Sequence, residues 1–412
     1  MRSLLRIRDF RLLFVGQAMS NWGNALTNLT LLILTERLTG SVAAVAVTAI
    51  AIALPQLLIG LVAGVYVDRW NRKAVMVASD VVRGLLVVAF VLVRSADQMW
   101  LLYAIAFVQA AVGTFFNPAK GAIIPAIVGM ERLLAANSTM ETARVVVGLL
   151  GTAAAGVWAG VTDVLWPIFV IDGATFVVSA GFEWAMRVDG TPERHKSRGS
   201  VGAEMVAGLR AATSSRTLVG VLVSAAVLMF GLGAVNVLLV PFVVGDLGIS
   251  ETWFGALEGA QVVAMVLGGS LVAVLAARLS ATRVITGSLA GIGAVIATVS
   301  LVTRPWHLIV LLFVVGWFVT PLQASISTLV QSEVADEMRG RIGSAMGTVI
   351  EGANVASMAL AGGAAAVVGT RGVFVGSGGV ALLAAAASIV LFRGASSGSD
   401  HPVTRTVVPA EG

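Results

Sequence analysis

The chain has 412 residues, of which 58% are hydrophobic and 12% charged, with a mean hydropathy of +0.94. This is roughly half the charge of a soluble domain, so the composition excludes a water-exposed globular surface. The net charge of +5 does not indicate a nucleic-acid partner, because the Lys and Arg residues lie in short loops and form no basic stripe. Apolar runs of about eighteen residues or more recur along the sequence, which predicts serial membrane spans.

The apolar runs predict an all-α membrane protein with about twelve spanning helices. The first run follows Arg2, Arg6, Arg8 and Arg11 and is too long for a signal-peptide core, so we expect it to remain as a span. The expected spans are 12–34, 44–67, 74–94, 100–120, 139–161, 165–187, 217–240, 252–276, 283–303, 306–329, 342–368 and 372–393.

The basic residues predict the orientation in the membrane. With the N-terminus inside, most of the 27 Lys and Arg residues fall on the inner side. Outside are only Arg37, Arg94, Arg304 and Arg371. This bias places both termini in the cytoplasm, with the chain in a cytoplasmic (inner) membrane.

A polar, basic break divides the predicted spans into six and six. It covers residues 188–216 and is expected to be a cytoplasmic linker between an N-terminal bundle, 1–187, and a C-terminal bundle, 217–393. Residues 394–412 are rich in Ser, Pro and Gly and are expected to form a disordered cytoplasmic tail.

The two predicted bundles show a weak internal repeat. Pairing Gly60 with Gly269 brings Arg69 onto Arg278, and a Pro in the fourth span recurs in the tenth. Duplicated six-helix halves would place a repeat in this way, so two pseudo-symmetric bundles are expected.

The loop after the second span carries a recognisable motif. Gly64-Val-Tyr-Val-Asp68-Arg69-Trp-Asn71-Arg72-Lys73 resembles the signature loop of the major facilitator superfamily, G-x-x-x-D-R-x-G-R-K. Further stretches resemble the branch with macrolide-efflux proteins and enterobactin-type siderophore exporters. They are Asp80-x-x-Arg83, Phe116-Asn-Pro118-Ala, Ile124-Pro125, Ala136-Asn137, Asp172-Gly-Ala-Thr-Phe176 and Arg339-Gly-Arg341. The resemblance covers about residues 8–393 and implies the major facilitator fold.

The signature loop has a physical explanation of its own. Asp68 beneath a helix N-terminus would be stabilised by the helix dipole, while Arg69, Arg72 and Lys73 can pair with acids on adjacent loops. Such contacts would latch one end shut; the alternative is that these charges only fix topology. Asn71 stands where the family has Gly, and we expect it to keep the turn because Asn tolerates a left-handed backbone.

Two further positions bear on the resemblance to proton-coupled exporters. In the fifth span, Gly151 and Gly156 match the family's Gly-Pro-x-x-Gly-Gly antiporter element, but its Pro and one Gly are absent. With Gly148 and Gly160 these glycines also permit close helix contacts. In the fourth span, Gln109 lies near the position where many drug–proton antiporters carry Arg. The family resemblance therefore does not by itself imply proton coupling for this chain.

Polar stripes run along three predicted spans. Each stripe repeats at three or four residues and so lies on one helix face. The residues are Gln17, Asn21, Asn24 and Asn28; Gln109, Gly113 and Asn117; and Thr320, Gln323, Ser327 and Gln331. The family resemblance implies that the first, fourth and tenth helices line a central cavity, where these side chains would face substrate. The alternative is hydrogen bonding between helices.

Acids inside spans are candidate functional groups. Asp80 with Arg83, and Glu141 with Arg144, are three residues apart and predict intramembrane ion pairs. Glu183 lies within a turn of the interface and is expected to snorkel toward water.

Three other acids, Asp172, Glu258 and Glu351, lack a local partner in the sequence. Their depth in apolar surroundings makes them candidates to carry a coupling proton, and Glu351, about 15 Å into its span, is the first choice. The alternative for each is a buried, protonated acid that hydrogen-bonds a neighbouring helix.

The sequence predicts a transporter and no enzyme. It has no Cys, three scattered His residues and no phosphate-cradling G-x-x-x-x-G-K-[ST] loop, so neither a metal nor another cofactor is expected. The expected function is proton-coupled efflux of a drug-like compound or siderophore by alternating access, performed by a monomer in the lipid bilayer. The alternatives are an uptake symporter or facilitator for a native metabolite and, with less support, a channel or membrane enzyme.

Overall fold

The computed structural model describes residues 2–67, 69–191, 201–213, 215–334 and 336–392. All regular elements in these ranges are helices, which confirms the predicted all-α class. Helices are expected because a bilayer offers no water to backbone polar groups, so each span must satisfy them internally. Asp68 and the predicted tail, 394–412, lie outside the described residues.

The N-terminal half contains seven α-helices and three short 3₁₀ turns in the described residues. They are α1 (Arg2–Leu5), α2 (Arg8–Thr39), α3 (Val42–Val67), α4 (Arg72–Ala89), η1 (Phe90–Leu92), η2 (Ala96–Gln98), α5 (Met99–Val128), η3 (Met130–Arg132), α6 (Leu133–Val161) and α7 (Trp166–Trp184).

A linker helix and the C-terminal half follow. The elements are α8 (Val201–Ala212), α9 (Arg216–Val240), the π-helical turn η4 (Pro241–Asp246), α10 (Trp253–Arg278), α11 (Ala281–Val299), α12 (Pro305–Glu333) and α13 (Asp336–Leu391). α8 lies within the predicted linker.

Nine stretches of the described residues are long and apolar enough to cross a membrane. The last, Ala345–Leu391, is broken at Gly369, whose φ of 71° lies outside the helical range, so α13 contains two spans. α2 and α10 are also of spanning length, and α2 is the more polar of the two. The described helices are therefore consistent with the predicted twelve spans.

Each half is a bundle with its own contacts. In the N-terminal half α2 packs on α6 and α7, and α4 packs on α5 and α7; in the C-terminal half α13 packs on α9 and α11, and α10 on α12. The halves meet where α3 packs on α13 and α6 packs on α10. A two-fold operation that exchanges the halves interchanges these two contacts, in agreement with the predicted pseudo-symmetry.

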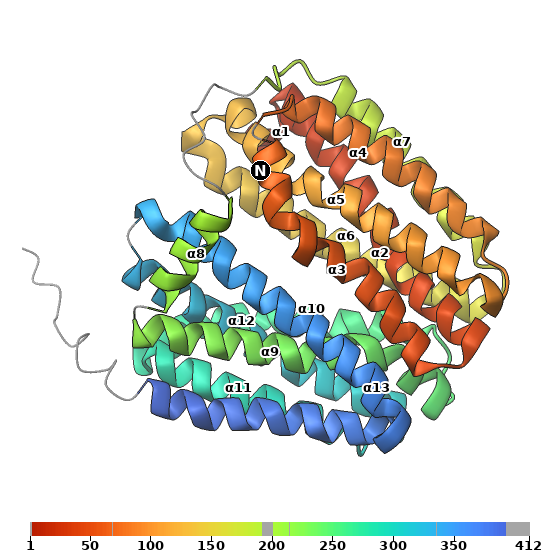
Figure 1. Cartoon of the computed structure of the whole chain (residues 1–412), viewed down its shortest axis with the longest axis vertical. Coiled ribbons are helices and arrows are strands. Elements are labelled where there is room, and N and C mark those ends of the chain that lie inside the picture. Colours follow the sequence, from red (N-terminus) through yellow and green to blue (C-terminus); the bar gives the residue numbers. More distant parts are fainter. Residues whose placement is uncertain (1, 68, 192–200, 214, 335, 393–412) are drawn as a thin grey trace, which may run out of the picture.

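The two halves converge at one end of the molecule only. In Figure 1 their helices approach each other on the right and diverge toward the left, where α8 lies between them. We call the left end, where α2 begins at Arg8, the terminal end, and the opposite end, where α2 finishes at Thr39, the far end. The buried cluster shared by both halves includes Ile33 and Ala159 of the far end. A second cluster, around Phe10 and Met76 at the terminal end, contains N-terminal residues alone.

Apolar grooves support the internal repeat. One lies between α4 and α5 and another between α10, α11 and α12. In the register that pairs Gly60 with Gly269, Ala74 falls on Arg283 and Ser79 on Ser288, and all four residues line these grooves. The weak sequence repeat thus corresponds to equivalent places in the two bundles.

Gly173 of α7 allows the close approach of α4. A Cβ at this position would lie 2.5 Å from Val88 Cγ2 and 3.0 Å from the Gly84 carbonyl oxygen. Gly173→Ala should therefore destabilise the protein by about 1–3 kcal/mol through overpacking, even though Ala is the better helix former. Gly181→Ala on the same helix meets nothing within 4 Å and is the matched control. Thermal unfolding in detergent should separate the variants; equal midpoints would contradict this packing.

Candidate functional site

The signature loop is held against the chain that follows α7. The Asn71 side chain accepts a hydrogen bond from the Ala74 backbone N–H at 3.0 Å and so caps α4, while the Arg72 backbone N–H donates to the Gly190 carbonyl at 2.7 Å. Asn71 has φ −64° and ψ 112°. The expectation of a left-handed turn residue is wrong, because Asn71 serves instead as an extended N-cap.

The basic side chains of this loop bind carbonyl oxygens. Arg72 Nη1 donates to Ala122 O at 3.3 Å, and Lys73 Nζ donates to Met186 O at 2.6 Å. Among the described residues neither side chain pairs with an acid, contrary to the expectation, because carbonyls within α5 and just beyond α7 bind them instead. Arg69 is exposed and Gly64 is half-buried. The loop residues that the structure describes therefore bind within the N-terminal half.

The cap at Asn71 can be tested directly. Asn71→Ala should cost about 1 kcal/mol, because the Ala74 N–H loses its acceptor, whereas Asn71→Gly should cost only a few tenths. Asn71→Asp keeps an acceptor and serves as the control. The midpoint of unfolding in a denaturing detergent would rank the three variants, and an Asp variant as weak as the Ala variant would contradict the capping role.

The predicted polar stripes have mixed environments. Gln17 and Gln109 are buried, Asn21 and Asn24 are half-buried, and Thr320 donates to the Met265 carbonyl of α10 at 2.8 Å. The exposed members are Asn28, Asn117, Gln323 and Ser327. Each stripe therefore combines exposed side chains with buried or half-buried ones.

Asp80 and Arg83 form an ion pair in the interior of the N-terminal half. The Asp80 side chain is fully buried and that of Arg83 is 13% exposed. The guanidinium carbon of Arg83 lies 4.8 Å from the ring centroid of Phe116 on α5 and 4.6 Å from that of Phe176 on α7. Both rings fix the cation, which thereby joins three helices.

Glu183 does not snorkel. It is fully buried, and Gln17 Nε2 of α2 donates to its Oε1 at 3.3 Å. The expectation of a solvated acid is wrong, because α7 turns this face toward α2 and α4 and not toward the interface. The sequence carried a usable signal: Asp172, Thr175, Ser179 and Glu183 are spaced by three or four residues and share one helix face.

Asp172 lies farther along the same face and is also fully buried. Thr175 Oγ1 donates to Asp172 Oδ1 at 3.2 Å, so this acid does have a local polar partner, contrary to the prediction. A Cβ at Gly23 of α2 would lie 2.2 Å from Asp172 Oδ1. The glycine thus brings α2 into direct contact with the carboxyl group.

The two predicted acids of the C-terminal half have different surroundings. Asn354 Nδ2 donates to Glu351 Oε1 at 3.3 Å, which again supplies a local partner that the prediction had excluded. Glu351 and Glu258 are each half-buried, on α13 and α10. No ion pair within 4 Å involves either acid among the residues that the structure describes.

Glu141 and Arg144 form the second predicted ion pair, in α6. Arg144 Nε donates to Glu141 Oε2 at 2.9 Å, with side chains 55% and 60% exposed for Arg144 and Glu141. This pair has the same spacing as Asp80–Arg83 but lies on an open face.

An ion pair that the sequence did not predict joins the two halves at the far end. Arg37 of α2 donates through Nε and Nη2 to Glu251 Oε1 at 3.1 and 2.9 Å, and through Nη2 to Ala159 O at 2.5 Å. Gly156 and Gly160 of α6 allow this approach, because Cβ atoms there would lie 2.7 Å from Glu251 O and 2.2 Å from Thr252 Cγ2. We call Arg37 and Glu251 the far-end latch. The partners are 214 residues apart, so no local sequence pattern could reveal them.

Glycines of α6 also serve the N-terminal bundle. A Cβ at Gly151 would lie 2.5 Å from Trp22 O of α2, whereas one at Gly148 would meet nothing within 4 Å. The prediction that glycines of this span permit close helix contacts is therefore confirmed for Gly151, Gly156 and Gly160 and not for Gly148.

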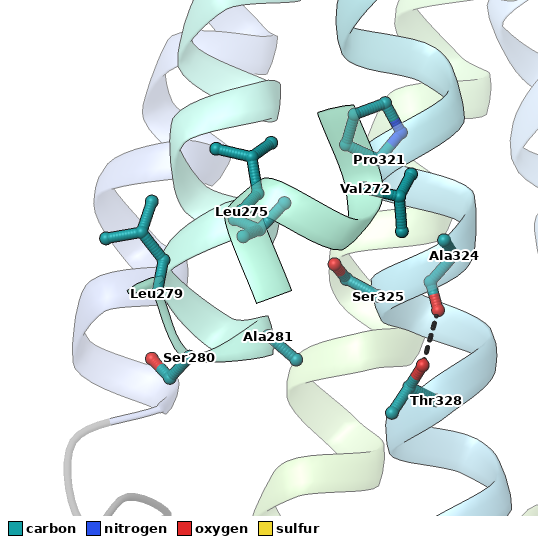
Figure 2. A pocket seen from close by; sticks show the side chains of 10 residues that line it. Val272, Leu275, Leu279, Ser280, Ala281, Pro321, Ala324, Ser325 and Thr328 are labelled. Carbon is teal, nitrogen blue, oxygen red and sulfur yellow. Dashed lines mark hydrogen bonds between the residues drawn. The ribbon is translucent and has the colours of Figure 1, made fainter. Parts of the chain in front are cut away.

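A small pocket in the C-terminal half is formed by α10, α11 and α12 (Figure 2). Its lining is mostly aliphatic, with Ser280, Ser325 and Thr328 as polar members, and Thr328 donates to the Ala324 carbonyl of its own helix at 2.8 Å. Among the side chains that the structure describes, no charged residue and none of the predicted cavity residues line this pocket. Within the described residues, moreover, no group of three His, Cys, Asp or Glu residues could hold a metal ion.

Comparison with known proteins extends these observations. A family model described as a transmembrane secretion effector matches residues 2–407. BacE of Bacillus amyloliquefaciens, named for bacilysin export, is 29% identical over 119 residues, which is 29% of this chain and 30% of BacE. Macrolide efflux protein A of Streptococcus pyogenes is 27% identical over 129 residues, covering 30% of this chain and 31% of that protein. The chain thus aligns with under a third of the length of these curated relatives.

The fold also occurs in solved transporters. A bacterial homologue of the human lysosomal transporter Spinster, in an inward-facing and unoccupied conformation, superposes with a TM-score of 0.74 at 15% identity. The match covers 93% of this chain and 96% of that one. At this identity the likeness concerns the fold.

Proposed function

Since the chain belongs to the transmembrane secretion effector family of the major facilitator superfamily, we propose that it is a secondary transporter that exports a small amphiphilic molecule. The observation that carries this proposal is the family match across residues 2–407. The names of two relatives, a macrolide efflux protein and a putative bacilysin exporter, favour export of a drug-like compound over uptake. A siderophore is the second substrate class that we propose.

The arrangement of the halves supports alternating access. They are latched at the far end by Arg37 and Glu251 and diverge at the terminal end (Figure 1). The bias of basic residues places the terminal end in the cytoplasm, so the conformation would be inward-facing in a cytoplasmic membrane. The bundles 1–187 and 217–393 would rock about the bound molecule, with 188–216 as the connecting segment.

We place substrate contacts at the polar stripes of α2, α5 and α12. The exposed amides Asn28, Asn117 and Gln323 suit hydrogen bonding to a neutral or weakly charged amphiphile. A monomer provides both halves of such a site. Proton entry would supply the energy, with Glu351, Asp172 and Glu258 as the predicted candidates for carrying the proton.

Accumulation of labelled compounds tests the function. Efflux-deficient bacteria with and without the protein would receive a macrolide, a cationic dye or a siderophore, in the presence and absence of a protonophore. Export predicts lower accumulation of at least one compound and its recovery with protonophore. Higher accumulation in the presence of the protein would indicate uptake instead, and no change with the protein in the membrane would contradict broad export.

Glu351→Gln provides the matched coupling variant for this assay. If Glu351 carries the proton, the variant should raise accumulation to the protonophore-treated level without changing the amount of protein. If it exports as well as the wild type, coupling resides elsewhere.

A further inference from the structure

A buried polar seam runs between α2 and α7. On α2, Gly16 and Gly23 bring the backbone against Ser179 and Asp172: Cβ atoms there would lie 3.2 Å from Ser179 Oγ and 2.2 Å from Asp172 Oδ1. Gln17 donates to Glu183 beside the first glycine. The seam therefore extends over three helical turns of α7, from Asp172 to Glu183.

Polar atoms of this seam lack hydrogen-bond partners of regular geometry. Eleven buried side-chain atoms of the described residues are in this state, and six belong to the seam and the adjoining α4 pair. They are Thr27 Oγ1, Asp80 Oδ2, Arg83 Nε, Asp172 Oδ2, Ser179 Oγ and Glu183 Oε2. Buried polar atoms are nearly always paired, so this concentration of unpaired atoms calls for an explanation.

The charges at the seam do not balance. Asp80, Asp172 and Glu183 are fully buried acids, and Arg83 is the cation bound among them, already paired with Asp80. Lys120 of α5 is the next cation and lies 5.8 Å from the Phe116 ring. It interacts electrostatically with Glu183 and Arg83 of the seam and also with Glu141 and Arg144 of α6. With fewer cations than acids in an apolar interior, the seam is neutral only if it binds protons.

From this geometry we propose that Glu183 is the acid that takes up and releases the coupling proton, with Gln17, Asp80 and Arg83 as its positioning residues. The proposal rests on the proton-driven export proposed above and moves the coupling site from Glu351 to the N-terminal half.

The step involves one proton and no other bond. In the present arrangement Arg83 pairs with Asp80, and a neutral Glu183 accepts from Gln17. When the Glu183 O–H proton leaves toward the terminal end, where α7 finishes one residue later, the new carboxylate attracts Arg83. The unpaired Arg83 Nε and Glu183 Oε2 can then satisfy each other. Because Arg83 also contacts Phe116 and Phe176, this exchange shifts α4 against α5 and α7.

α2 links the seam to the latch between the halves. It carries Gln17, bound to Glu183, and Arg37, bound to Glu251 of the other half. A change of hydrogen bonding at Gln17 therefore acts on the same rigid helix that closes the far end. This gives protonation a direct mechanical route to the conformation of the halves.

Infrared difference spectroscopy of the purified protein in liposomes, between acid and alkaline pH, tests the assignment without any substrate. The wild type should show a protonated-carboxyl C=O band that titrates, and Glu183→Gln should remove this component. Gln17→Leu should shift the same component in frequency, because that carbonyl loses its donor, while Asp172→Asn and Glu351→Gln should leave it in place. A component that survives Glu183→Gln, or ignores Gln17→Leu, overturns the proposal.

Transport of labelled erythromycin in the same liposomes separates the two proposals. Wild type should expel erythromycin in response to a pH gradient, and Glu183→Gln should lose this response but keep exchange of labelled for unlabelled compound. If Glu183→Gln keeps the pH-driven transport, the coupling role is wrong. If the wild type moves neither erythromycin nor the cationic dye and siderophore of the cell assay, while the infrared component behaves as expected, the export proposal fails and the protonation assignment stands.

Discussion

Replacing Arg37 by Ala should open the far end of the protein. Arg37 is the only side chain that joins the halves by an ion pair within the described residues, and its partner Glu251 is 12% exposed at the side chain. The substitution leaves Glu251 buried without its countercharge and frees the Ala159 carbonyl. Loss of a charged hydrogen bond of this kind costs about 1.5–3 kcal/mol, so the closed population should fall roughly 10- to 100-fold relative to the open one.

The absence of native Cys makes this opening measurable with single introduced thiols. Ala159 is 2% exposed and lies in the interface between the halves. Labelling of Ala159→Cys by a membrane-impermeant maleimide should therefore accelerate when Arg37→Ala is added. Ser95→Cys, exposed in the turn between α4 and α5, should be labelled equally in both backgrounds.

Asp163 supplies the control for charge. It lies 3.5 Å from Arg37 Nη1 but its side chain is fully exposed, so Asp163→Asn should leave the labelling of Ala159→Cys nearly unchanged. If Arg37→Ala also leaves it unchanged, the apolar contacts hold the far end closed and the latch has no gating role.

Whether a feature could be predicted depends on how far apart in the sequence its interacting residues lie. Helix class and span positions depend on local hydropathy, and each is evident from about twenty residues. The pairs Asp80–Arg83 and Glu141–Arg144 are one helical turn apart, so their formation was predictable too. Their environments were not: one is buried between two aromatic rings and the other is exposed, because burial depends on which helices pack alongside.

Long-range partners account for the features that sequence reasoning missed. Gln17 lies in the first span of the N-terminal half and Glu183 in the last, although the two are hydrogen-bonded. Arg37 and Glu251 belong to different halves. The helical stripe and the family resemblance together predict that the amide of Gln17 faces a substrate cavity, whereas it binds the buried Glu183. A stripe identifies a face of a helix, but packing decides whether that face meets a cavity or a buried acid.

The two intrahelical ion pairs provide a test of how strongly the seam depends on its cation. Arg83→Leu should destabilise the protein by about 3–5 kcal/mol, because Asp80 remains fully buried without its partner. Arg144→Leu removes an Arg from the same spacing on an exposed pair and should cost less than about 1 kcal/mol. Unfolding in a denaturing detergent, followed by the fluorescence of the nine Trp residues, would measure both.

A second substitution separates stability from coupling. Adding Asp80→Asn to Arg83→Leu removes the stranded charge, so most of the lost stability should return. Transport should not return with it, since the partner exchange at Glu183 requires the guanidinium. A double variant that regains stability and pH-driven transport together would mean that Arg83 only neutralises Asp80. A double variant as unstable as Arg83→Leu would instead indicate that the contacts of the guanidinium with Phe116 and Phe176 dominate its contribution.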